Sequence, residues 1–489
     1  MTGNILLFAA LLLIAILLDR MVQPKPVAGG RSLIGTAISL LAVTTGFGLV
    51  LALCGNVLAS AGFSAAFVAL LVLISGAKRD VMGEPLLFSD FAMIGSVFRH
   101  PQFYLAALTR VQVVLIVLGL VGVLPLFAAV FVAEPYPHLA GLMIFVAALS
   151  LLRLMIRRAL DQGVASQPDP EADVLRHGLI ATLILYRRRW MATVDAVPAG
   201  TQPQVPDVEP MLVMIVQCES FACPVELFGD PGLSLPGLAS ARAAAWQHGR
   251  LLVSGFGANT MRTEYGVIFG REEAELGFRC FDPYQTALRD VDHALPARLR
   301  RAGWRNHFVH PHDMRFYNRH RIMPAAGFDE LVGIEHFAKP GPGEGRYVTD
   351  AAMTDRLLAL AGTVNGPSLI YAVTIENHGP WAATQASASP SPAYLPLVRN
   401  SDAMLASLIK GMGGLGRPSM LVFFGDHRPS IPGLSQPGGD RHTPYVVLRF
   451  DAQGRPVSGD AAPRDLTPAQ LHHSLFGLLA RQAATAVAA

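Results

Sequence analysis

Charged residues are scarce in this sequence. Asp, Glu, Lys and Arg make up only 15% of the 489 residues, 52% are hydrophobic, and the formal net charge is +3. No dense block of Lys or Arg occurs, so the composition argues against a nucleic-acid partner. The chain is too apolar for an ordinary soluble enzyme and too long for a pure membrane bundle. We therefore expect two unlike parts.

Cysteine is also rare. Cys54 lies in an apolar run, and Cys218, Cys223 and Cys280 lie in the polar half without the paired spacing of a structural zinc site. The spacing allows one disulfide and implies none. A thiolate-rich metal centre is therefore not indicated.

Long apolar runs, in contrast, fill the first third of the chain. Five runs of about 20 residues suit the ~30 Å core of a bilayer; they cover residues 4–19, 33–54, 58–76, 111–133 and 138–156. The first run lacks a small-residue cleavage pattern at its end, so we interpret it as a retained helix. The pattern predicts a transmembrane domain over 1–160 with about five helices.

Two segments of this first part differ from the apolar runs. Residues 77–110 mix charges, prolines and apolar clusters, which predicts an interfacial, partly helical segment. Residues 161–210 hold a short apolar piece at 178–186 and a Pro-rich end at 197–210, which predicts a linker with short helices.

From residue 211 to about 480 the pattern changes to short apolar runs that end in polar residues. The runs at 211–217, 368–375 and 419–425 read as buried strands. The pattern predicts helices between and around them, at 286–302, 351–363 and 396–412. Alternating strands and helices predict an α/β domain with a mostly parallel sheet flanked by helices, whose functional residues gather at the carboxyl ends of the strands.

Polar residues follow the three predicted strands directly. They are Glu219, His378 and the pair Asp426 and His427. Oxygen ligands with one imidazole suit one divalent cation such as Mn²⁺, Mg²⁺ or Zn²⁺. An isolated carboxylate is more often a helix cap or an ion-pair partner. The adjacent Asp426 and His427 are more specific, because both side chains are costly to bury without a partner.

A glycine-rich loop at 255–270 supplies a candidate nucleophile, Thr260, at the predicted start of a helix. Helix N-termini bind anions, and a metal can activate a hydroxyl. A plain helix cap, made by Thr260 or Thr263, is the alternative on sequence alone.

Five motifs occur together in order: QCESF, GANTMRTEY, HPHDMRFYNR, TIENHGPW and FFGDHRPS. They resemble the lipoteichoic acid synthase and phosphoglycerol transferase family of the alkaline phosphatase/sulfatase superfamily. The apolar spans and the GEPLLFSDF segment are similar to the membrane part of that family. The C/S-x-P-x-R motif of a formylglycine sulfatase is not matched at any of the three cysteines in the polar half.

The resemblance implies specific roles. Glu219, Thr260, Asp426 and His427 would hold one divalent metal, Mn²⁺ being favoured, and Thr260 would form a covalent phosphoglycerol adduct. Arg319, His378 and His442 would bind substrate, with His310, His312 and Asp313 as looser candidates. Differences from the family at Arg262, Tyr317 and Glu376 leave the head group open.

The implied function is a membrane-anchored transferase that moves phosphoglycerol from phosphatidylglycerol to a glycan or polyol-phosphate acceptor. The alternatives are a phosphoethanolamine transferase of the same superfamily and a non-catalytic membrane scaffold or sensor.

The resemblance also implies a multi-pass protein of the cytoplasmic (inner) membrane with an extracytoplasmic, periplasmic catalytic domain. The distribution of basic residues conflicts with this orientation. With five spans, the basic residues near the span ends share a side with the catalytic domain, which the positive-inside rule would place in the cytoplasm. These residues are Arg20, Lys25, Arg31, Lys78, Arg79, Arg99, Arg157 and Arg158.

Overall fold

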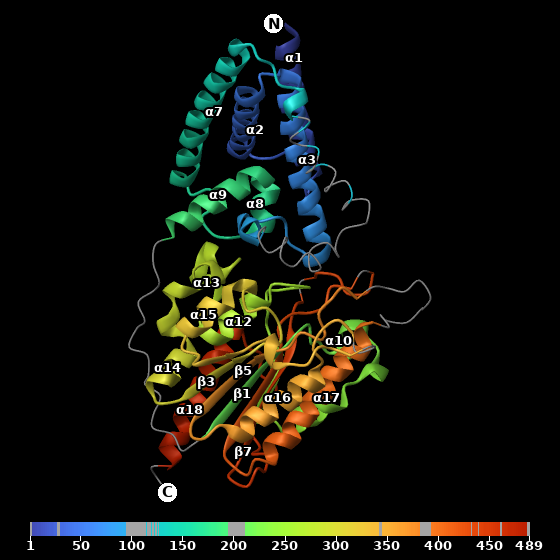
Figure 1. Ribbon diagram of the computed structural model, residues 1–489, viewed down its shortest axis with the longest axis vertical. Helices are drawn as coiled ribbons and strands as arrows, with labels where there is room; N and C mark the ends of the chain where they lie inside the picture. Colours follow the sequence, from blue (N-terminus) through green and yellow to red (C-terminus); the bar gives the residue numbers. More distant parts are fainter. Residues whose placement is uncertain are drawn as a thin grey trace. The chain divides into compact units, whose positions relative to one another are not determined.

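The chain forms two compact units, Met1–Val194 and Asp195–Ala489 (Figure 1). The computed structural model describes residues 2–26, 30–93, 131–193, 211–341, 345–381, 393–431, 433–438, 440–459 and 462–486, with scattered residues between 114 and 130. All four cysteines are free thiols.

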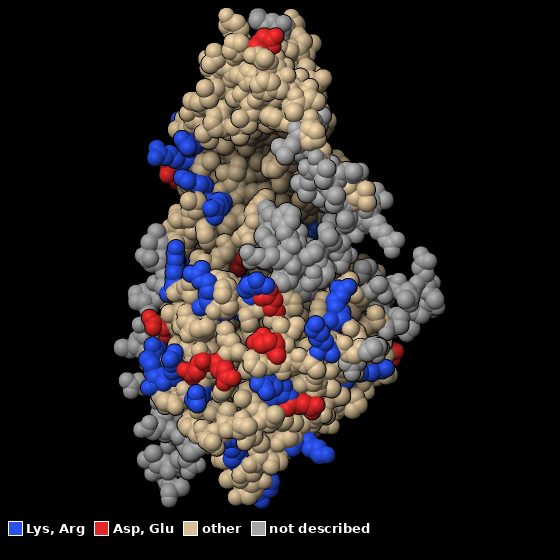
Figure 2. All heavy atoms as spheres, viewed as in Figure 1, with Lys and Arg blue, Asp and Glu red and all other residues tan. Residues whose placement is uncertain are grey.

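Four helices of the first unit are long and apolar enough to cross a membrane. They are α1 (Thr2–Met21), α2 (Leu33–Cys54), α3 (Val57–Met82) and α7 (Pro135–Asp161). They coincide with four of the five predicted spans, and most of the predicted span at 111–133 lies outside the described residues. Large apolar side chains such as Leu6, Leu13, Leu73 and Met143 are exposed on these helices, and Figure 2 shows a stretch of this unit's surface without charged residues.

Local signals set the ends of these helices. The Ser32 hydroxyl accepts a hydrogen bond from the backbone N–H of Gly35 and caps α2, and Gly55, at φ +70°, ends it. Asn56 then caps α3 in the same way. Three shorter helices complete the described part of the unit: the 3₁₀ helix η1 (Phe88–Met93), α8 (Pro170–His177) and α9 (Leu179–Ala192). The last two fall in the segment for which we predict a linker.

The second unit is built on a seven-stranded sheet with the order β2-β7-β6-β1-β5-β3-β4. Its strands are β1 (Leu212–Cys218), β2 (Gln247–Leu251), β3 (Arg305–Val309), β4 (Glu330–Val332), β5 (Ser368–Val373), β6 (Ser419–Gly425) and β7 (Thr443–Phe450). β7 runs antiparallel to the other six strands of this sheet. The predicted mostly parallel sheet is therefore confirmed.

Helices cover both faces of this sheet (Figure 1). Successive residues of β1 alternate between two buried clusters, because side chains along a strand point to opposite faces. One face packs against α12 (Thr260–Phe269), α14 (Leu295–Arg301), α15 (Arg319–Ala325) and α18 (Pro468–Ala486). The other packs against α11 (Pro236–Ala244), α16 (Asp350–Thr363) and α17 (Tyr394–Gly413). The short helices α10 (Pro224–Phe228) and α13 (Glu273–Leu276) lie in connections.

The prediction of a helix over 286–302 is wrong in its first half. That half forms short 3₁₀ turns, and the α-helix α14 begins only at Leu295, next to Pro296, which suits a helix start. The Asp290 carboxylate is fully buried and accepts hydrogen bonds from Tyr265 and Arg271. These tertiary contacts hold the segment away from a continuous helix.

Candidate metal centre and nucleophile

The parallel register of the central strands brings the predicted ligands to one edge of the sheet. Cys218 of β1 pairs with Gly425 of β6, so the next residues, Glu219 and Asp426, emerge side by side. A side chain at position 425 would overlap the carbonyl oxygen of Phe221, so only glycine allows this close approach. His378 follows β5 at the same edge.

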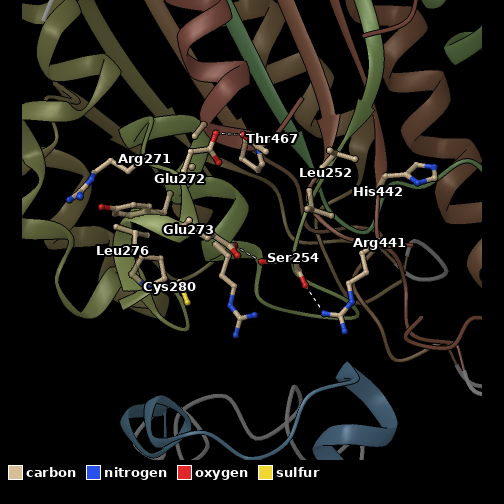
Figure 3. A pocket seen from close by; sticks show the side chains of 18 of the residues that line it. Leu252, Ser254, Arg271, Glu272, Glu273, Leu276, Cys280, Arg441, His442 and Thr467 are labelled. Carbon is tan, nitrogen blue, oxygen red and sulfur yellow. Dashed lines mark hydrogen bonds between the residues drawn. The ribbon is translucent and has the colours of Figure 1, made fainter. Parts of the chain in front are cut away.

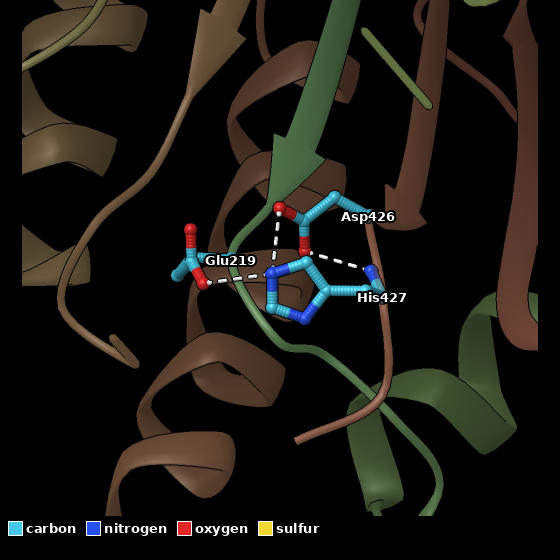
Figure 4. A group of neighbouring side chains, drawn as sticks. All are labelled: Glu219, Asp426 and His427. Carbon is cyan, nitrogen blue, oxygen red and sulfur yellow. Dashed lines mark hydrogen bonds and ion pairs between the residues drawn. The ribbon is translucent and has the colours of Figure 1, made fainter. Parts of the chain in front are cut away.

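Glu219, Asp426 and His427 form a buried cluster (Figure 4). The Nε2 atom of His427 lies 3.4 Å from Oε1 of Glu219 and 3.6 Å from Oδ2 of Asp426. The ligand atoms of a tetrahedral ion with bonds of ~2.0–2.2 Å lie roughly 3.3–3.6 Å apart. The spacing therefore suits one small divalent cation.

The hydrogen bonds around the cluster also fit a bound cation. Nδ1 of His427 lies 3.1 Å from the carbonyl oxygen of Arg428, which can only accept, so Nδ1 carries a hydrogen and Nε2 is the ring nitrogen that could bind a metal. Oδ1 of Asp426 accepts two backbone N–H groups, whereas its buried Oδ2 has no hydrogen-bond partner among the described residues. These nitrogen and oxygen atoms lie close enough together to bind one cation.

Electrostatics of the cluster lead to the same conclusion. Burial, and next the charge of Asp426, raise the pKa of Glu219 above its usual range. A divalent cation would favour the ionised form of both carboxylates. The residues present therefore fit the metal that the sequence predicts.

Thr260 is the first residue of α12, and all ten residues of this helix are buried. Its Oγ1 atom lies 3.5 Å from Nε2 of His427, so the hydroxyl faces the cluster. The Thr263 hydroxyl instead donates to the backbone carbonyl of Asp426 at 2.7 Å. Neither hydroxyl caps α12, whose N-cap residue is Asn259. The alternative of a plain helix cap is therefore wrong for both hydroxyls, and Thr260 is the one that faces the cluster.

Strained backbone surrounds these residues. Five non-glycine residues in the described part of the chain have positive φ angles: Ala165, Ser220, Asn259, Tyr317 and Asn318. Ser220, Asn259 and Asn318 directly adjoin Glu219, Thr260 and Arg319, and Tyr317 precedes Asn318. Such strain costs about 1–3 kcal/mol per residue and persists where the surroundings impose it, typically at functional sites.

Arg319 reaches this edge at the start of α15 and is only 1% exposed. Its guanidinium makes two parallel hydrogen bonds to Glu264, at 2.9 and 2.7 Å, and a third contact with Nε2 of His310 at 3.1 Å. Burial and the positive charge of Arg319 hold the pKa of His310 well below its usual range. Two of the five guanidinium N–H groups are left for other partners.

The other predicted substrate residues lie on either side of the cluster. Nδ1 of His378 donates to the carbonyl of Gly379 at 2.9 Å, and burial lowers the pKa of this ring. His442 lies just before β7, where its ring nitrogens face the carboxylates of Glu226 and Asp440. The structure therefore brings all the predicted residues to one sheet edge, but only Glu219, Asp426, His427 and Thr260 converge.

Comparison with known proteins agrees with this architecture. A sequence profile of the sulfatase family matches residues 212–477. The chain belongs to the sulfatase family. It is 30% identical over 431 residues to the capsular polysaccharide biosynthesis protein RkpI of Rhizobium meliloti (strain 1021). The matched region covers 82% of this chain and 80% of RkpI.

Among solved structures, this sulfatase-family protein is similar to the lipooligosaccharide phosphoethanolamine transferase EptA from Neisseria meningitidis, an integral membrane protein. The TM-score is 0.50 at 14% identity, over 97% of this chain and 95% of EptA. The lipoteichoic acid synthase LtaP from Listeria monocytogenes matches with a TM-score of 0.44 at 19% identity, over 57% of this chain and 75% of that chain. The predicted fold and family resemblance are confirmed, and the four apolar helices make the chain a membrane protein of this family.

Figure 3 shows a separate cavity of about 310 Å³. Arg262, Tyr265 and Gly266 line it from α12, and His442 lines it from the segment before β7. None of the four converging residues lines this cavity. The cavity is therefore distinct from the candidate metal centre.

Sequence reasoning missed Glu264, which is fully buried beside the site. The signal was available, since Glu264 lies in the GANTMRTEY motif four residues after Thr260 and therefore on the same face of a helix. Its partner Tyr284, whose hydroxyl donates to Glu264 at 2.6 Å, carried no such signal.

Proposed function

We propose that this protein is a metal-dependent transferase that moves a phosphoglycerol group from phosphatidylglycerol to a hydroxyl of a glycan or polyol-phosphate acceptor. The observation that carries the proposal is the position of the Thr260 hydroxyl, 3.5 Å from the imidazole of a cluster that suits a divalent cation. A hydroxyl held in this way at a helix N-terminus is suited to covalent catalysis on phosphorus.

The reaction would proceed in two displacements. Oγ1 of Thr260 attacks the phosphorus, the bond from phosphorus to the diacylglycerol oxygen breaks, and phosphoglycerol remains on Thr260. The acceptor hydroxyl then attacks the same phosphorus and releases the threonine. When bound, a divalent cation lowers the pKa of a coordinated hydroxyl and stabilises charge on phosphoryl oxygens.

The chain's own residues would orient the donor. Arg319 has two N–H groups without a partner among the described residues, and these suit the oxygens of a phosphodiester. His378, whose pKa is lowered by burial, would contact the head group. His442 would contact substrate at the other side of the cluster, near β7.

The membrane unit suits a lipid donor, because a tethered catalytic domain meets phospholipid at high effective concentration. We propose that the protein lies in the cytoplasmic (inner) membrane with its catalytic domain in the periplasm. Reporter fusions within residues 197–210 test this orientation. An active cytoplasmic reporter would instead support the distribution of basic residues.

For the acceptor we propose a glycan hydroxyl. The relative RkpI is described as a capsular polysaccharide biosynthesis protein, and the two chains match over most of their lengths. For the metal we propose Mn²⁺ ahead of Zn²⁺ and Mg²⁺, because two carboxylates, one hydroxyl and one imidazole form an oxygen-rich set of ligands. Elemental analysis of the purified protein identifies the ion.

One experiment names the donor and the nucleophile together. The purified full-length protein is incubated with labelled phosphatidylglycerol or phosphatidylethanolamine, and the peptide that carries Thr260 is analysed by mass spectrometry. A phosphoglycerol adduct supports the proposal. A phosphoethanolamine adduct would favour the alternative transferase, and no adduct together with no bound metal would favour a scaffold.

A further inference from the structure

Glu264 is a buried carboxylate whose lone pairs are fully used. Oε1 accepts hydrogen bonds from Nε of Arg319 at 2.9 Å and from the Tyr284 hydroxyl at 2.6 Å. Oε2 accepts from Nη2 of Arg319 at 2.7 Å and from the side-chain amide of Gln217 at 3.5 Å. All four partners are donors, an arrangement that matches the ionised carboxylate.

The position of Glu264 ties it to the reacting groups. It lies one helical turn after Thr260, on the same face of α12, where side chains four residues apart are about 5–6 Å from each other. Gln217 lies two residues before the predicted ligand Glu219 on β1. The buried ion pair of Glu264 and Arg319 therefore belongs to the wall of the site.

Arg319 is held from two sides. Nδ1 of His310 lies 3.0 Å from the carbonyl oxygen of Val373, which can only accept, so Nε2 of His310 is the acceptor for Nη1 of Arg319. Glu264 from α12 and His310 from the end of β3 thus fix the plane of the guanidinium. Tyr317 and Asn318, which precede Arg319, have left-handed backbone conformations with positive φ angles. This turn of the backbone brings Arg319 between Glu264 and His310.

We propose that Glu264 determines specificity: it positions Arg319 and cancels its charge, so that the site accepts a phosphodiester monoanion in preference to a phosphate monoester dianion. An unpaired Arg319 would add one positive charge beside the phosphorus, and this charge would favour a dianion over a monoanion. With Glu264 in place the pair is formally neutral, while two guanidinium N–H groups still donate to the phosphate oxygens. The inference rests on the proposed function, because it concerns the diester that Thr260 would attack.

Two substitutions separate the charge from the geometry. Glu264→Gln keeps the length of the side chain and removes its charge, whereas Glu264→Asp keeps the charge and shortens the side chain. The test measures binding of inorganic phosphate, a dianion above neutral pH, and of dimethyl phosphate, a monoanion, by titration calorimetry of the metal-loaded full-length protein. Neither probe has a head group, so the result does not depend on whether phosphoglycerol is the group transferred.

Glu264→Gln should strengthen phosphate binding relative to dimethyl phosphate by about tenfold or more. Glu264→Asp should leave this ratio at the wild-type value. With the chromogenic diester bis(p-nitrophenyl) phosphate it should lower kcat more than it changes KM, because Arg319 is mispositioned. An unchanged ratio in a folded Glu264→Gln protein would overturn the proposal.

The chain offers a matched control. Asp290 is also fully buried and paired with arginine, through Arg271 at 2.9 Å, and it contacts α12 through Tyr265. Asp290→Asn should lower thermal stability and leave the binding ratio unchanged. If Glu264→Gln fails to fold, the double variant Glu264→Gln/Arg319→Gln removes both charges of the pair, which is the less costly change. Its ratio should match the wild type, and a shifted ratio would contradict the proposed role of the charge.

Discussion

The Oγ1 atom of Thr260 lies 3.5 Å from the Nε2 atom of His427, although 167 residues separate the two along the chain. The first residue opens a buried helix and the second follows a central strand, so the sheet and the helix packed on it create the contact. Among the described residues, the hydroxyl has no backbone hydrogen-bond partner, and it faces the cluster that suits a cation. This arrangement supports the proposal that Thr260 is the nucleophile.

Replacing Thr260 should therefore abolish transfer with little loss of stability. Thr260→Ala should lower the rate of head-group transfer at least about 10³-fold, since removing a nucleophile removes the covalent route. Thr260→Ser keeps a hydroxyl and should retain measurable transfer. Release of labelled diacylglycerol checks both variants, and thermal unfolding confirms that they are folded. Undiminished release by the alanine variant would exclude Thr260 as the nucleophile.

Asp426 should limit the stability of the protein when no metal is bound. Its buried Oδ2 faces Glu219 and His427 without a hydrogen-bond partner among the described residues. Asp426→Asn should thus raise the melting temperature of the chelator-treated protein and remove most of the stabilisation by added Mn²⁺. In the wild type, metal at 100 times its Kd adds about 2.7 kcal/mol. Asp402→Asn, which alters a carboxylate that accepts hydrogen bonds at the start of α11, is the control and should keep the response to Mn²⁺.

Much of this centre could be predicted from the sequence, because strand ends carry strong local signals. The runs before Glu219 and Asp426 are fully buried strands, and parallel neighbours must bring their next residues together. The same reasoning places His378 at the edge but cannot tell that it stays outside the cluster. That difference depends on side-chain direction, which no run of apolar residues encodes.

Other features depend on contacts between distant segments and could not be predicted. The pair of Glu264 and Arg319 joins α12 to the start of α15, and the two residues are 55 positions apart along the chain. The short strands β2 and β4 have weak patterns and are defined by their pairing partners, and the antiparallel direction of β7 depends on its pairing with β6 and β2. The predicted helix over 286–302 failed for the same reason, since buried partners of Asp290 outweigh local propensity.

Arg31 should hold together one end of the membrane unit. Its guanidinium pairs with the Asp19 carboxylate at 2.9 Å and donates to the carbonyls of Val174 and Leu175 at 2.7 and 2.9 Å. Lysine has three donors on one nitrogen and cannot reach partners on several sides. Arg31→Lys should therefore destabilise the unit by about 2 kcal/mol or more, seen as faster proteolysis of the full-length protein. The exposed Arg157→Lys is the control, and equal proteolysis of the two variants would contradict this role.

Asp350 should make the second unit, Asp195–Ala489, less stable as the pH rises. Burial, and next the charge of Glu376, raise the pKa of Asp350 to about 7, and its Oδ1 has no hydrogen-bond partner among the described residues. The folded state therefore binds more protons than the unfolded chain between about pH 4 and pH 7, and the free energy of unfolding falls through this window. A shift of this size corresponds to about 4 kcal/mol at most.

Asp350→Asn removes this titration and keeps the shape of the side chain, including an oxygen that can accept from Ser401. Its melting temperature should exceed that of the wild type at pH 8, and the advantage should shrink steadily down to pH 5. Asp355→Asn, on the exposed side of the same helix, should show no such pH-dependent difference. Melting curves of the metal-loaded full-length protein across this range provide the measurement. An advantage that is constant with pH would mean that Asp350 is already ionised in the folded protein at pH 5.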